Sequence, residues 1–115
     1  MKLYRWNEIL KEQMNPRFAR QVIHTERITV AKIEVKKGGM VPRHNHENEQ
    51  LSMVVSGRLK FVFDDAETIV GPGEVLQIAP NAFHSVEALE DGEVCDLFAP
   101  VRADWMSGDD AYLRR

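Results

Sequence analysis

The sequence has a single cysteine, no excess of basic residues and no long apolar run, and each absence excludes a class of protein. With Cys95 alone, no disulfide can form within the chain, which favours a reducing, cytoplasmic location. The formal net charge of −3 gives no electrostatic reason to bind nucleic acid or an anionic membrane. No apolar run approaches the ~18 residues of a membrane span. The first ten residues also lack the apolar stretch of a secretory signal.

What the sequence does contain is a chain of 115 residues, of which 43% are hydrophobic. That length fits one domain with one hydrophobic core. We expect a single domain over 1–115, with its core at about 16–102, an N-terminal arm at 1–15 and a C-terminal tail at 103–115.

Short β-branched or alternating runs, separated by turn residues, recur along the core. The segment 28–35 alternates most regularly, and we expect a hairpin-like pairing of 50–56 with 59–63 around Ser56 and Gly57. Residues 4–14 could form a short helical turn, and the tail is expected to be irregular or a short helix. Further strands are expected at 18–22, 67–70, 75–78, 84–88 and 94–98. About eight or nine short strands predict an all-β barrel or sandwich.

Three of the four histidines fall into two clusters that glycines border. His44, His46 and Gln50 share parity, so on a strand their side chains would point to one face. His84, distant in sequence, would supply a third imidazole. Three imidazole nitrogens and one amide oxygen suit one divalent transition metal ion, which could be nickel, zinc, iron or manganese.

Two alternatives bear on this ligand set. Glu49 is the rival oxygen ligand, because a turn before it could reset the parity, but Gln50 is preferred. His24 lies outside both clusters and is interpreted as a surface residue. A neutral Gln50 would leave the full +2 charge on the site, which raises its Lewis acidity and favours an anionic ligand.

These two clusters resemble the two motifs of the cupin family. The first follows Gly-x5-His-x-His-x3-Gln-x6-Gly from Gly38 to Gly57, with Gln50 where the family usually has glutamate. In the second, Pro80 is kept, and Asn81 stands where glycine is usual and tolerates the same left-handed backbone. The resemblance implies an all-β cupin fold, a double-stranded β-helix or jelly-roll barrel.

A narrower resemblance concerns the end of the chain. The cluster from His44 to Gln50, followed by Asp-x-Phe-x-Pro-x-Arg from Asp96 to Arg102, looks like the small pectin-degradation cupins of the KdgF type. Those proteins have glutamine as fourth ligand and convert 4,5-unsaturated uronate monomers to linear ketones. The resemblance therefore implies carbohydrate metabolism, with a sugar acid as the small-molecule substrate.

Three residues near the end of the core are candidate catalytic groups. Asp96 lies in an apolar strand, where an unpaired carboxylate is costly to bury, so it is a candidate proton shuttle beside the metal. Arg102 offers a forked donor for a substrate carboxylate, with a salt bridge to Asp96 or Asp104 as the structural alternative. Phe98 shares the parity of Asp96 and could pack against a sugar ring or line the core.

The roles of Arg58, Lys60, Gln77 and Phe83 stay open, between lining the pocket and lying on a solvated face. Two other functions also stay open. One is a metal-dependent dioxygenase of the quercetinase-like cupin type, against which Gln50 counts. The other is a cupin that binds a sugar or metal without turning it over.

An apolar stripe of Leu51, Met53 and Val55 has the opposite parity to Gln50 and would face out of the barrel. Such a stripe needs a cover. A C2 homodimer is the expected cover. The alternative is that the N-terminal segment folds over it through Trp6 or Ile9.

Overall fold

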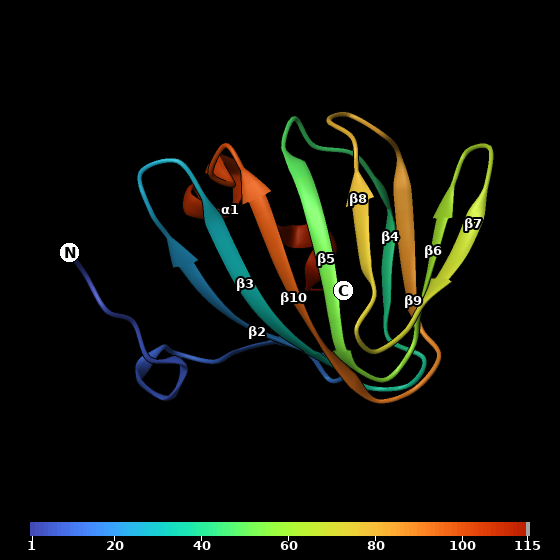
Figure 1. Cartoon of the computed structure of the whole chain (residues 1–115), viewed down its shortest axis with the longest axis horizontal. Helices are drawn as coiled ribbons and strands as arrows, with labels where there is room; N and C mark the ends of the chain where they lie inside the picture. Colours follow the sequence, from blue (N-terminus) through green and yellow to red (C-terminus); the bar gives the residue numbers. More distant parts are fainter. Residues whose placement is uncertain (115) are drawn as a thin grey trace.

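The computed structural model, which describes residues 1–114, consists of two antiparallel sheets (Figure 1). The expected all-β jelly-roll fold is confirmed. The larger sheet contains, in spatial order, β1 (Glu12–Asn15), β2 (Phe18–His24), β3 (Thr29–Val35), β10 (Gly92–Ala99), β5 (Glu49–Ser56) and β8 (Val75–Ile78). The smaller sheet contains β4 (Met40–His44), β9 (His84–Ala88), β6 (Leu59–Phe63) and β7 (Glu67–Val70).

Alternation along the strands places the core between the two sheets. In β3, every second residue from Thr29 to Val35 is buried, and the residues between them are partly exposed. β10 continues this pattern, since Asp96 pairs with Ala31 on one side and with Ser52 of β5 on the other. The core consists mainly of aliphatic and aromatic side chains from both sheets: Phe18, Ala31, Ile33, Val35, Val54, Leu59, Phe61, Val70, Ile78, Ala88, Val94 and Phe98.

The expected hairpin between 50–56 and 59–63 is wrong. β5 pairs with β10 and β8, whereas β6 pairs with β9 and β7, so Gly57 and Arg58 carry the chain from one sheet to the other. Strands distant in the sequence occupy both edges of β5, and β6 has the following strand β7 on one edge and β9 on the other, so no edge is free for a pairing of β5 with β6. This connection is one of several at which the chain passes from one sheet to the other.

Two strands were missed from the sequence. Within residues 4–14 only Trp6–Glu8 are helical, as the short 3-10 helix η1, and β1 begins at Glu12 and pairs with β2. β4 was missed because Pro42 interrupts it and proline has no amide hydrogen. The strand tolerates Pro42 since it lies at the edge of the smaller sheet.

The C-terminal residues return to the barrel. α1 (Ala103–Met106) and the 3-10 helix η2 (Ala111–Leu113) follow β10, and η2 contacts β4. In Figure 1 this segment, in red, lies partly behind β10 and β5. Trp105 and Leu113 are buried in the core, so the tail contributes to it. In the part of the chain that the structure describes, no helix has the length and apolar character needed to cross a membrane.

Candidate metal centre

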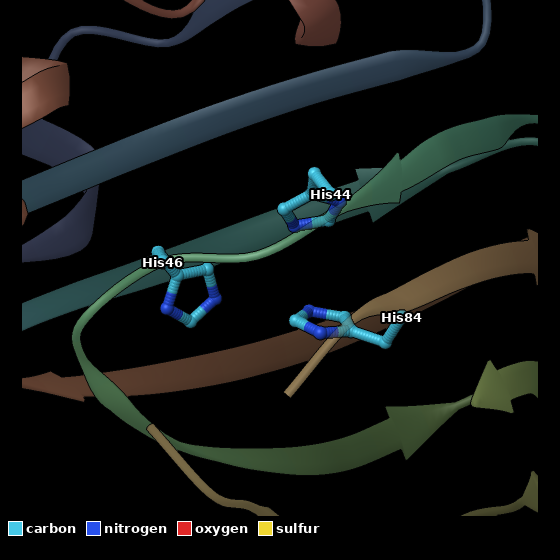
Figure 2. A group of neighbouring side chains, drawn as sticks. All are labelled: His44, His46 and His84. Carbon is cyan, nitrogen blue, oxygen red and sulfur yellow. The ribbon is translucent and has the colours of Figure 1, made fainter. Parts of the chain in front are cut away.

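Three imidazoles meet at one end of the barrel. His44 ends β4, His46 lies in the following connection, and His84 begins β9 directly opposite His44 in the strand register. One nitrogen of each ring lies within 4.8 Å of the corresponding nitrogens of the other two. Figure 2 shows the three rings turned toward a common space. The structure thus brings together the three histidines of the two sequence clusters.

These residues do not converge through a shared face of one strand, as the sequence analysis predicted. β4 ends at His44 and β5 begins at Glu49, so His44, His46 and Gln50 do not lie on one strand. The chain turns at Glu47 and Asn48, and this turn brings Gln50 back beside His46. Parity along a single strand was therefore the wrong reason for grouping these residues.

The two rival oxygen ligands lie in different surroundings. Gln50 is 5% exposed, and its Oε1 lies 3.0 Å from Nε2 of His46. Glu49 is exposed, and its carboxylate accepts a hydrogen bond from Gln77 at 3.0 Å. His24 lies away from the three rings, with its Nδ1 2.7 Å from the Thr29 hydroxyl.

Backbone carbonyls fix the tautomers of the three rings. Nδ1 of His44 donates to the carbonyl oxygen of Pro42 at 2.7 Å, and Nδ1 of His84 donates to Ala82 at 2.8 Å. Nδ1 of His46 likewise donates to Asn48 at 3.1 Å. Because a carbonyl can only accept, each Nδ1 carries the hydrogen and each Nε2 keeps its lone pair.

Burial keeps these rings neutral. It lowers the pKa of His44 and of His46 to about 4. Burial also lowers the pKa of His84. A neutral imidazole with a free nitrogen is the form that binds a metal ion.

The contact between His46 and Gln50 is a direct test of whether a cation fits. Gln50 donates through Nε2 to the Ser52 hydroxyl at 2.9 Å, so its Oε1 faces His46. Nε2 of His46 and Oε1 of Gln50 are then two acceptors 3.0 Å apart, which repel each other unless a cation lies beside both. Such a spacing is typical of two ligands of one ion at about 2.1 Å. The donor set therefore fits nickel, zinc, iron or manganese.

One cavity contains three of the four candidate ligands and the candidate catalytic groups. His44, Gln50 and His84 line it together with Asp96, Phe98 and Arg102. This cavity is not lined by any of the four residues whose roles the sequence left open: Arg58, Lys60, Gln77 and Phe83. Phe83 instead lies against the Arg43 guanidinium, 4.0 Å from ring centroid to carbon.

Asp96 is a buried carboxyl without a full set of partners. It is 7% exposed, and its Oδ1 has no hydrogen-bond partner among residues 1–114. Burial raises the pKa of Asp96 to about 6, and the opposing effects of Ser52, Arg102 and Gln50 do not cancel this rise. The group can therefore gain or lose a proton near neutral pH.

Arg102 forms its ion pair with Asp104 and not with Asp96. Its Nε and Nη2 donate to the two carboxylate oxygens of Asp104 at 3.0 and 2.8 Å. The guanidinium carbon also lies 4.7 Å from the Phe98 ring centroid and 4.3 Å from that of Trp105. Phe98 in turn meets His46 edge-on, at 5.6 Å between ring centroids.

Sequence reasoning missed three residues around the site. Asn48 is buried, and its backbone carbonyl accepts the hydrogen bond from Nδ1 of His46. Its side-chain amide donates to the carbonyl oxygens of Pro100 and Val101, and these bonds fix the connection that carries His46. Trp105 and Tyr112 come from the tail, whose sequence does not alternate as a strand does and so does not indicate which side chains point inward. Only the apolar aromatic character of these two residues could have suggested that the tail packs on the barrel.

The comparisons with known proteins agree with this fold. A family model described as a cupin domain matches residues 31–99. The structure of KdgF from Halomonas sp. superposes with a TM-score of 0.83 at 25% identity, over 90% of this chain and 99% of that one. A cupin described as RmlC-like, from Shewanella frigidimarina, gives 0.84 at 23% identity, over 91% and 96%.

More distant structures share the fold alone. An oxalate decarboxylase variant from Bacillus subtilis superposes with a TM-score of 0.73 at 16% identity, over 84% of this chain and 29% of that one. No curated protein sequence matches the chain.

Proposed function

The chain belongs to the cupin family, and we propose that its site converts a 4,5-unsaturated uronate, a small sugar acid, to its linear ketone form. The likeness to KdgF, at 25% identity over nearly the whole of both chains, supports this substrate class. The observation that carries the proposal is Asp96, a buried carboxyl with an unpartnered oxygen in the wall of the cavity that His44 and His84 also line.

The metal ligands that we propose are His44, His46, Gln50 and His84. A divalent ion bound there would act as a Lewis acid toward a substrate oxygen. Because Gln50 is neutral, the protein would leave the charge of that ion undiminished, which favours an anionic substrate.

Asp96 is the proposed proton shuttle. In ketonisation the anomeric hydroxyl loses a proton as the bond between C1 and the ring oxygen breaks. A proton is then added to C4, and C5 becomes the ketone carbon. One carboxyl that accepts the first proton and delivers the second balances the reaction, and no oxidant or reductant is needed. Burial raises the pKa of Asp96, so this carboxyl accepts a proton more readily than an exposed one.

Arg102 is the proposed anchor for the substrate carboxylate, with Phe98 as the adjacent apolar wall. Asp104 occupies Nε and Nη2 of Arg102, and no hydrogen bond of Nη1 is found among the described residues. The presence of Asp96 and Arg102 in one cavity with the imidazoles favours an enzyme over a protein that only binds.

The test uses purified protein whose metal content has been measured and an unsaturated uronate, with loss of the enol absorbance as the signal. Asp96→Asn should retain the metal and lose about a hundredfold or more in rate. Asp65→Asn, at an exposed turn, is the matched control and should behave as wild type. If the metal-loaded wild type does not accelerate the reaction over buffer, the proposed function is wrong.

We also propose that the chain forms a homodimer through the outer face of the larger sheet. An apolar row crosses four strands there: Ile23, Val30, Leu97 and Leu51, neighbours in the strand register. Farther along the same face, Val55 of β5 is 55% and Val75 of β8 58% exposed. Gln21 donates to the carbonyls of Trp6 and Ile9, so η1 lies against β2, with β3 and β10 between it and β5. Light scattering should give the mass of a dimer for wild type and of a monomer for Leu51→Lys.

A further inference from the structure

The C-terminal turn forms part of the wall of the metal centre. The ring of Tyr112, in η2, lies 4.9 Å from that of His44 between centroids, with 34° between their planes. Tyr112 lines the same cavity as Gln50, His84 and Asp96. A ligand that binds beside His44 would therefore meet the side chain of Tyr112.

The hydroxyl group of Tyr112 is used only as an acceptor. Nη2 of Arg102 donates to it at 2.6 Å, and Nε1 of Trp105 lies at 3.5 Å, the limit of a hydrogen bond. A phenol also has one hydrogen to donate. No acceptor for that hydrogen is found in the part of the chain that the structure describes, so the O–H can donate to a ligand.

The turn that carries Tyr112 is anchored on both sides of this residue. Asp110 forms an ion pair with Arg20, and both side chains are 4% exposed. Leu113 is buried in the core, and its carbonyl accepts from the Asn15 side chain at 3.0 Å. The hydroxyl is thus held in place before a ligand arrives, which lowers the entropic cost of the new hydrogen bond.

We propose that Tyr112 contacts the substrate and that its hydroxyl donates a hydrogen bond to an anionic oxygen of it, beside Arg102. This assignment rests on the proposed function, in which the substrate carries a carboxylate. Arg102 alone is a weak anchor because Asp104 already binds two of its nitrogens. A hydroxyl that accepts from a guanidinium is polarised by it and becomes a stronger donor to an anion.

Tyr112→Phe tests this, with Tyr4→Phe as the matched control, because Tyr4 lies near the N-terminus and contacts Lys2. Tyr112→Phe should raise the KM for the unsaturated uronate about ten- to a hundredfold, the range of a hydrogen bond to a charged group, with a smaller effect on kcat. Its metal content should equal that of wild type. Tyr112→Gln, which restores an acceptor for Arg102 and a donor, should regain part of the affinity.

A second measurement does not depend on turnover. Saturated galacturonate lacks the double bond, so calorimetric titration of the metal-loaded proteins measures binding alone. Suppose that Tyr112→Phe loses affinity for galacturonate by the same factor while the wild type does not convert the unsaturated sugar. That result would support the contact between Tyr112 and the sugar and would refute only the proposed function. Wild-type binding and KM in Tyr112→Phe would overturn the assignment while the function stands. A wild type that binds neither sugar would overturn both.

Discussion

Replacing Asp110 with asparagine should reduce the free energy of unfolding by about 3 kcal/mol, because it leaves the buried Arg20 guanidinium with only the partly exposed Glu12 carboxylate, 3.3 Å from its Nε, as counter-charge. Arg20 is 4% exposed and lies 4.5 Å from the Trp105 ring, and its Nη1 has no partner among the described residues. Breaking a buried pair costs about 3–5 kcal/mol. If the C-terminal turn detaches before the barrel unfolds, the loss is limited by what the turn contributes, and burial of Leu113 is worth about 1.5–3 kcal/mol. The loss in free energy of unfolding should therefore level off at about 3 kcal/mol.

Urea unfolding followed by tryptophan fluorescence measures this effect, and two further variants sharpen it. Arg114→Gln removes an Asp110 partner that is 45% exposed and should cost less than about 1 kcal/mol. Arg20→Met combined with Asp110→Leu should be close to wild type, since an apolar pair replaces both charges. If Asp110→Asn equals wild type, or Arg114→Gln costs as much, the burial argument is wrong.

The sign of the pH dependence gives an independent check on the same pair. Burial alone would raise the pKa of Asp110, but hydrogen bonds from Arg114 and Arg20 outweigh it and lower the pKa. A carboxylate whose pKa falls on folding stabilises the folded state above its ordinary value of about 4, and that stability is lost as the pH decreases further. Wild type and Asp110→Asn should therefore converge in stability in acid.

Two further predictions concern the metal centre and the barrel. His84→Ala should abolish stoichiometric metal binding in elemental analysis while His24→Ala retains it, and equal metal contents would contradict the assignment. Gly92→Ala should cost about 3 kcal/mol or more in urea unfolding, because its Cβ would lie 2.2 Å from the Ser56 carbonyl oxygen. Gly73→Ala meets no atom within 4 Å and should cost only about 1–2 kcal/mol for its positive φ, so similar losses would refute the steric argument.

The sequence alone determined the fold class and the membership of the histidine cluster. Alternation of the kind seen in β3 follows from the two-residue period of a strand, which is a local property. Asn81 adopts a φ of 66°, as its replacement of a motif glycine predicts. Strand alternation and the turn at Asn81 are readable because they depend on neighbouring residues in the chain, whereas the resemblance to the two cupin motifs grouped His84 with His44 and His46.

Only the tertiary structure decided which strands pair, what surrounds Arg102 and how the tail contributes to the site. β6 forms a local hairpin with β7, but β5 pairs with β10 and β8 and the other partner of β6 is β9, and no local pattern encodes pairings across those separations. From the sequence Arg102 could pair with Asp96 or Asp104; in the folded chain it pairs with Asp104, and Trp105 and Tyr112 pack around its guanidinium. Burial and hydrogen bonding depend on which side chains meet in space, and for Tyr112 and His44 that meeting requires the whole barrel to close.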